Sequence, residues 1–204
     1  MSSRYQTIAA STRFEIEKVK ASRFLADALP LGDEREVESA LKRVRKEFHD
    51  ARHHCWAYRL GPGGLRFRSS DDGEPGGSAG KPILQQIEAR ALSDVLVVVT
   101  RWFGGTKLGV GGLVRAYGAA AAAVLDRSPR RAVVLTQRIE IAFPYERTAV
   151  VQGLLSAGEL APAAAHYDVE VRLEVEMPLD QLDAFEHELC ERSASRARFR
   201  RLAP

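Results

Sequence analysis

Cysteine is scarce in this sequence, and its scarcity argues against two classes of protein. The 204 residues include 2 cysteines, Cys55 and Cys190, which lie far apart and in no metal-ligand spacing. A small secreted domain stapled by disulfides would need several bridges, so we expect reduced thiols in a cytoplasmic protein. His53, His54 and Cys55 alternate along a predicted strand and cannot all reach one ion. We therefore expect no metal, and no other cofactor.

Long apolar runs are missing as well. No uninterrupted apolar segment is long enough to span a bilayer, and the first residues, MSSRYQTIAAST, contain no apolar signal segment. We expect a soluble protein with no membrane partner, and the sequence leaves its oligomeric state open.

An excess of one sign of charge is also lacking. Lys and Arg number 30 against 27 Asp and Glu, a net charge of +3, so only local clustering can indicate a nucleic-acid partner. One candidate stripe is Arg196, Arg198 and Arg200 on the predicted last strand. Its sheet has none of the exposed aromatics that RNA-recognition sheets use. A solvated face of cross-strand ion pairs is the better interpretation.

The order of predicted elements indicates an α+β fold in two domains. The break at Ser128-Pro129-Arg130-Arg131 separates residues 1–130 from residues 131–204, and the second domain has the ferredoxin-like order β-α-β-β-α-β. Residues 1–12 are predicted to be a frayed start. The elements that follow in the first domain are strands through 14–16 and 24–25, a helix over 33–48, a hairpin of 53–60 and 65–68, a helix over 82–90, a buried strand over 95–100 and a helix over 112–126. A strand over 132–135 is either the last strand of the first domain or a strand that reaches toward the second.

Two glycine-rich loops, 73–80 and 104–112, bracket the predicted helix and the buried strand. Charged residues stand among the glycines, which loops built only for flexibility do not need. Neither loop matches a nucleotide motif. A P-loop would need glycine at Pro75 and a hydroxyl residue at Pro82, and the dinucleotide fingerprint starting at Gly109 has Val114 at its sixth position.

The second loop is the candidate nucleic-acid site. Arg101, Lys107 and Arg115 supply positive charge, and the backbone of Gly104, Gly105, Gly111 and Gly112 can approach phosphates near a helix N-terminus. Trp102 and Phe103 either stack on bases or belong to the core. In the first loop, Asp71, Asp72, Glu74 and Lys81 are expected to structure the loop, with a ligand or a hard cation as the alternative.

Three segments carry a family resemblance: HDARHHCWAYRL, SDDGEPGGSAGKP and VLVVVTRWFGGTKLGVGGLVRAYG. They resemble the IMPACT family, of the bacterial two-domain YigZ type. The departures are Gly77 for the usual serine, Trp102 for tyrosine and Val110 for alanine. The resemblance implies a ribosomal-protein-like α+β domain and a ferredoxin-like domain, similar together to the last two domains of the translocation factor EF-G.

The resemblance also implies binding to RNA or ribosomes. Eukaryotic relatives regulate translation through a stress-kinase pathway, but with a further domain that this chain lacks. The leading hypothesis is a non-enzymatic RNA- or ribosome-binding protein linked to translation, with no residue assigned a catalytic role. One alternative is an enzyme acting on a phosphorylated or nucleotide substrate, with Asp71, Asp72 or Glu74 binding metal or acting as base. The other is a protein-interaction module that uses the C-terminal sheet.

Overall fold

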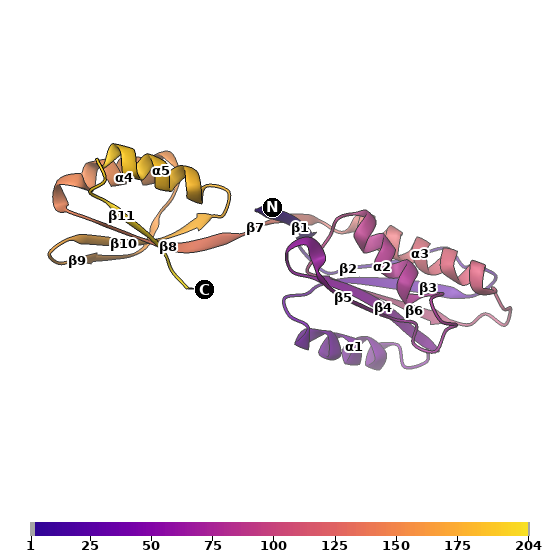
Figure 1. The fold of residues 1–204 in the computed structure, drawn as a ribbon. Coiled ribbons are helices and arrows are strands. Elements are labelled where there is room, and N and C mark those ends of the chain that lie inside the picture. Colours follow the sequence, from indigo (N-terminus) through magenta and orange to yellow (C-terminus); the bar gives the residue numbers. More distant parts are fainter. Residues whose placement is uncertain (1–2, 204) are drawn as a thin grey trace. The chain divides into compact units, whose positions relative to one another are not determined.

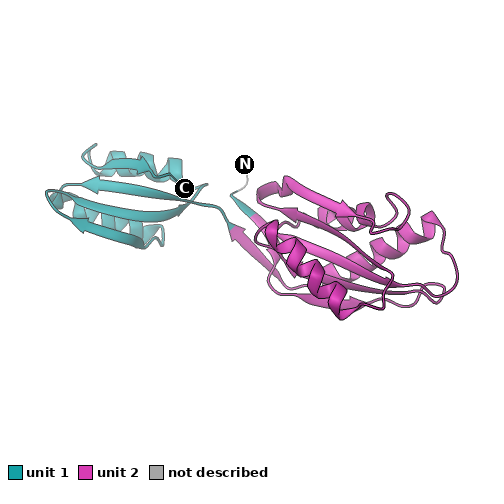
Figure 2. Cartoon of the chain, turned by 90° about the horizontal axis from the view of Figure 1, so that it is seen from below, with its two compact units in different colours: residues 1–4, 134–204 teal, residues 5–133 magenta. Residues whose placement is uncertain are grey.

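The computed structural model describes residues 3–203, which divide into two compact units (Figure 2). One unit is Tyr5–Val133, and the other contains the chain from Val134 together with Ser3 and Arg4. The division lies close to the predicted boundary at residue 130. No helix in the described part of the chain is long and apolar enough to cross a membrane.

The first unit is built on a five-stranded antiparallel sheet in the order β2-β3-β6-β4-β5. Helix α1 covers one face, and α2 and α3 cover the other (Figure 1). The bounds are β2 Thr12–Glu15, β3 Arg23–Pro30, α1 Arg35–Glu47, β4 His53–Leu60, η1 Pro62–Gly64, β5 Arg66–Ser70, α2 Gly80–Ala89, β6 Val95–Trp102 and α3 Val110–Arg127.

Strand β6 lies at the centre of this sheet, as its continuous apolar run predicts. Val95, Val97 and Val99 pack under α2 and α3. Leu96 and Val98 point to the other face and pack under α1. Because a strand alternates its side chains, a strand covered on both faces must be apolar at every position. The same alternation continues to the end of β6 and places the next two side chains on opposite faces.

The start of the chain differs from the prediction. Strand β1, Arg4–Ile8, pairs with β7, Arg130–Val134, in a separate two-stranded sheet, so the frayed start predicted for residues 1–12 is wrong from Arg4 onward; residues 1 and 2 lie outside the described part. Thr7 and Ile8 are buried. The partner strand lies more than a hundred residues away in the sequence, and a local pattern cannot reveal such a pairing.

The second unit has the predicted order, with the sheet arranged β11-β8-β10-β9 and all its pairs antiparallel. The α+β fold class and the ferredoxin-like order are therefore confirmed. Residues of α4 and α5 share one apolar core with the sheet. The bounds are β8 Thr136–Phe143, η2 Tyr145–Arg147, α4 Thr148–Ala157, β9 Pro162–Tyr167, β10 Val171–Pro178, α5 Leu182–Arg192 and β11 Arg198–Arg201.

The face of this sheet away from the helices is charged. Arg138 pairs with Glu174, Arg198 with Glu170, and Arg200 with Glu140. The cross-strand ion pairs expected from the sequence are thus present. The basic stripe is largely neutralised by its neighbours, which leaves the first unit as the place to look for a site.

Candidate functional site

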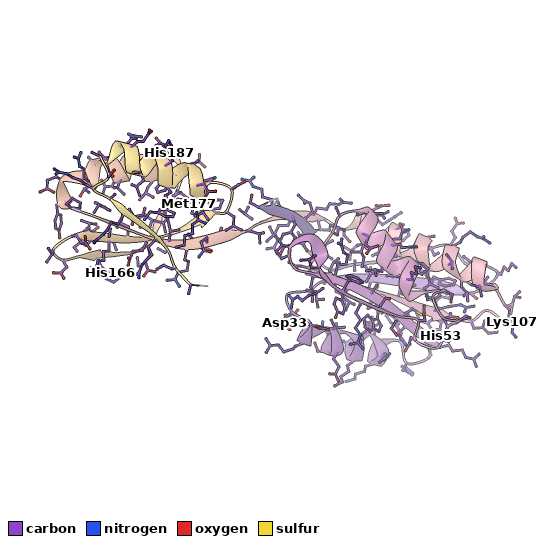
Figure 3. All side chains as sticks on the ribbon, viewed as in Figure 1. Asp33, His53, Lys107, His166, Met177 and His187 are labelled. Atoms are coloured by element: carbon purple, nitrogen blue, oxygen red, sulfur yellow. The ribbon has the colours of Figure 1, made fainter. Side chains whose placement is uncertain are left out.

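Both glycine-rich loops lie at one end of the first unit, and a pocket of about 330 Å³ opens between them. The first loop connects β5 to α2 and contributes Glu74 and Pro75 to the pocket. The second connects β6 to α3 and contributes Phe103, Lys107 and Leu108. Lys107 lies at the tip of this end, on the side where His53 is also found (Figure 3).

The first loop is held closed by the carboxylate of Asp71. Its Oδ1 accepts hydrogen bonds from the N–H of Ala79 at 2.9 Å and of Gly80 at 2.8 Å, and its Oδ2 accepts from Gly77 at 2.8 Å. Burial raises the pKa of this carboxyl, but the three backbone donors outweigh it and hold the pKa below its usual value. The charge of Asp71 is therefore used to shape the loop and to start α2.

Asp72 links the same loop to the rest of the unit. Its Oδ2 accepts from the backbone N–H of His54 at 2.7 Å, and its Oδ1 accepts from the guanidinium of Arg45 at 2.8 Å. The backbone of Asp72 has φ near +42°, a conformation that Asp tolerates better than most residues. Each carboxylate oxygen of Asp71 and Asp72 already has a protein donor.

Glu74 is different, because its side chain is only 5% exposed. Its Oε1 accepts from Arg101 Nη1 at 2.6 Å and from the Tyr117 hydroxyl at 2.7 Å, and His53 Nε2 lies 3.9 Å from the same atom. A buried carboxylate needs a cation and hydrogen-bond donors to offset its lost hydration. Glu74 therefore belongs to a buried polar network at the floor of the pocket.

Arg101, which the sequence predicts to contact phosphate, is buried and paired in the structure. Arg101 is 5% exposed and is committed to Glu74, with its guanidinium 5.5 Å from the ring centre of Phe24 and 5.6 Å from that of Phe103. It neutralises the buried carboxylate instead of extending into solvent.

Trp102 points to the opposite face of the sheet, as strand alternation requires. Its ring packs edge-to-face against Phe48 at 5.5 Å, and the Arg23 guanidinium lies 4.5 Å above it. Of the two interpretations left open for Trp102, stacking on a base or packing in the fold, the packing agrees with the structure. Phe103, by contrast, is 41% exposed and lines the pocket.

The second loop presents positive charge without partners. Lys107 and Arg115 are exposed, as is Lys81 on α2, and none of the three has an ion-pair partner among residues 3–203. Arg115 shares a second hollow of about 270 Å³ with Lys20, and Leu108 lines both this hollow and the pocket. Lys107, Arg115 and Lys20 therefore line two adjacent hollows at the start of α3.

The backbone at the start of α3 is also unsatisfied. Gly109 is the N-cap, with φ near +73°, and no side chain caps the helix. The first bond of the helix runs from the N–H of Leu113 to the carbonyl of Gly109 at 3.0 Å, so the N–H groups of Val110, Gly111 and Gly112 have no acceptor in the described chain. Gly104 serves another purpose: a Cβ there would lie 2.1 Å from the backbone of Ala21.

Sequence reasoning missed Lys20 and the network around Tyr117. Lys20 reaches the site only because β2 and β3 lie beside α3, and no motif includes it. Tyr117 is recognisable in the sequence only as a residue on the apolar face of a helix.

The buried thiol and phenol of the network are poor nucleophiles. Burial raises the pKa of the Cys55 thiol to about 12, and burial also raises the pKa of Tyr117. Cys55 donates to the carbonyl of Asp71 at 3.0 Å. Among the described residues, no group of three or more His, Cys, Asp or Glu side chains is arranged to hold a metal ion.

Comparison with known proteins places this arrangement in a family. The family model described as the Impact N-terminal domain matches residues 20–125. An IMPACT family member of Thermus thermophilus is 44% identical over 78% of this chain and 86% of its own length, and YigZ of Escherichia coli is 32% identical over 86% and 87%. A solved structure titled only as that of a hypothetical protein covers 100% of this chain and 99% of its own, with 28% identity and a TM-score of 0.70. The chain belongs to the IMPACT family.

Proposed function

We propose that the second glycine-rich loop binds the phosphate backbone of RNA, free or within a ribosome, in a cytoplasmic role linked to the regulation of translation. The observation that carries the proposal is the exposed, uncapped start of α3 with Lys107, Arg115 and Lys20 beside it. Helix N-termini and unpaired cations both favour phosphate oxygens.

The proposal narrows the set of contacts expected from the sequence. Lys107 and Arg115 remain phosphate contacts, with the backbone of Gly111 and Gly112, and Lys20 joins them. Phe103 is the remaining aromatic that a base can stack on. Arg101 pairs with Glu74 and Trp102 packs against Phe48, so neither is counted as a contact.

The enzymatic alternative has less support from the geometry. Asp71 and Asp72 have their oxygens engaged by the protein. The raised pKa of Cys55, about 12, keeps the thiol protonated at neutral pH, and only the thiolate is an effective nucleophile. An enzyme that used Asp71 or Asp72 would therefore need oxygens that already accept hydrogen bonds from the protein.

A titration of labelled single-stranded RNA over a series of salt concentrations tests the proposal. For about three phosphate contacts, the slope of log affinity against log salt should be roughly −2, from about −0.7 per contact. Lys107→Ala should flatten the slope by a little under ~1 and weaken all sequences alike. Lys42→Ala is the matched control, because Lys42 lies on α1 and pairs with Glu38.

The proposal fails if the wild-type protein binds neither RNA nor ribosomes at low salt. It also fails if Lys107→Ala and Lys42→Ala have the same slope as the wild type.

A further inference from the structure

The floor of the pocket between the glycine-rich loops offers a ligand one unpaired carboxylate oxygen, Oε2 of Glu74. Oε1 of Glu74 accepts from Arg101 and Tyr117, but its Oε2 accepts no hydrogen bond from any residue between 3 and 203. The side chain of Glu74 is nevertheless only 5% exposed, and it lines the pocket. Because the side chain lines the pocket, Oε2 can accept a hydrogen bond from a ligand.

The walls of the pocket are mostly apolar. They are formed by Phe103, Leu108, Val110, Leu113 and Pro75. Arg101 compensates the charge of Glu74, so the floor holds a neutral ion pair and not a free charge. A phosphate placed on this floor would meet the unpaired oxygen of Glu74 and be repelled. A purely hydrocarbon ligand would leave that oxygen without a donor.

The rim of the pocket differs from its floor. Lys107, the N-cap residue Gly109 and Val110, the first residue of α3, line its mouth. The exposed ammonium and the free N–H groups there suit an anionic group. The pocket therefore matches a ligand with a flat apolar body, N–H donors at the inner end and a phosphate at the outer end.

We propose that this pocket receives one unstacked guanine base, with its phosphate at Lys107 and the start of α3. The inference rests on the proposed function and adds the base that the site selects. Proteins that recognise single-stranded RNA hold splayed bases by stacking and by bonds to their Watson–Crick edge. A volume of about 330 Å³ is at the small end of ligand pockets, which suits a single base.

The hydrogen-bonding edges of the four bases select guanine. Guanine carries two adjacent donors, N1–H and the 2-amino group, and both can be accepted by Oε2 of Glu74. Uracil carries one N–H between two carbonyl oxygens, which the carboxylate repels. Adenine and cytosine each place a ring nitrogen acceptor beside their amino group. Guanine should therefore bind most tightly and uracil least.

The test has two arms, one with free nucleotides and one with RNA. In the first, calorimetric titrations compare GMP, AMP, CMP and UMP on the full-length protein. In the second, hexamers of uridine with and without one central guanosine are compared. We expect GMP and the guanosine hexamer each to bind at least about tenfold more tightly than their uridine counterparts, which is within the range for one specific contact to a base.

Two variants locate the effect. Glu74→Gln replaces the acceptor and should remove the preference for guanine, and Glu38→Gln on α1 is its matched control. Because Glu74→Gln leaves Arg101 without its buried partner, it can fail to fold. Val110→Trp is the second variant, since Val110 is 57% exposed and the larger side chain should fill the pocket mouth. It should lower the affinity for GMP at least about tenfold while Lys107 and Arg115 still bind the uridine hexamer.

The outcomes separate this inference from the proposed function. Equal binding of both hexamers, with GMP no tighter than UMP, overturns the guanine pocket and leaves the phosphate-binding function standing. Binding of GMP that Val110→Trp does not weaken also overturns it. If no RNA binds but GMP is selected and Val110→Trp abolishes the selection, the pocket stands as a nucleotide site and the RNA function falls.

Discussion

The two glycine-rich loops of this protein are alike in composition and opposite in their hydrogen bonding. In the first loop, the carboxylate of Asp71 accepts hydrogen bonds from three backbone N–H groups. In the second, the N–H groups of residues 105–112 donate to nothing within the described chain. A protein seldom leaves so many backbone donors together without a partner from solvent or a ligand. We therefore infer that the first loop has a structural role and that the second loop contacts the ligand.

The two loops differ in hydrogen bonding because their charged residues differ in sign. Acidic residues stand in the first loop, where they fold onto N–H donors and onto Arg101. Lys107 lies in the second loop and Arg115 just after it in α3, and neither has an ion-pair partner among residues 3–203. Glycine content alone does not distinguish a structural loop from a binding loop, but the sign of the neighbouring charges does.

The largest effect should come from filling the space at Gly104. A Cβ there would meet the backbone of Ala21 at 2.1 Å, so Gly104→Ala must displace the turn before β3 and should cost about 3 kcal/mol or more in unfolding free energy. At Gly105 a Cβ meets nothing within 4 Å and only the φ of +89° opposes it, so Gly105→Ala should cost about 1–2 kcal/mol. Urea unfolding measures both. Equal costs would mean that Gly104 is not held against Ala21.

The second largest loss of stability should come from Trp102→Ala. It removes the contact with Phe48 and the stacking of Arg23 and should cost about 3 kcal/mol of stability, at the low end for a large aromatic side chain because Trp102 is only half-buried. RNA affinity should not change at temperatures where the variant is folded. A variant that keeps its stability but loses RNA binding would return Trp102 to the binding surface.

Sequence patterns identified most of the fold because most of its elements are marked locally. A continuous apolar run predicted a strand over 95–100, which the structure extends to Val95–Trp102, and helical spacing predicted a helix over 112–126, which is Val110–Arg127. The pattern also placed His53 and Cys55 on one side of β4, where they line the same buried network. What it could not provide were pairings between distant segments. Arg101 looks like a free cation until Glu74, from the other loop, is placed beside it.

Replacing Asp71 should destabilise the protein less than Gly104→Ala or Trp102→Ala. Asp71→Asn puts amide donors where three backbone donors converge and should cost about 1–3 kcal/mol, the range for buried donors left unpaired. Asp72→Asn, which loses fewer loop contacts, should cost roughly 0.5–2 kcal/mol. Paired thermal melts at pH 7 compare the two variants. The view of Asp71 as the main organiser of the loop is wrong if Asp72→Asn is the more damaging.

The pH dependence of the Asp71 effect is the smallest and most specific prediction. The folded pKa of Asp71 lies below its usual value of 3.8. The unfolded chain therefore takes up the proton first, and the stabilisation is complete above the unfolded pKa and lost as pH falls through the folded one. The stability gap between wild type and Asp71→Asn should be constant near neutrality and should shrink below about pH 4. A gap that stays constant down to pH 2 would show that the charge of Asp71 is not what holds the loop.

Photo-crosslinking tests the central claim most directly. The wild-type protein is irradiated with a single-stranded RNA carrying 4-thiouridine, digested, and the attached peptides are identified by mass spectrometry. We predict that crosslinks concentrate on residues 103–115, with Phe103 and Lys107 among the attachment sites. Crosslinks confined to the first loop or to the paired charges of β11, with none between 103 and 115, would contradict the account.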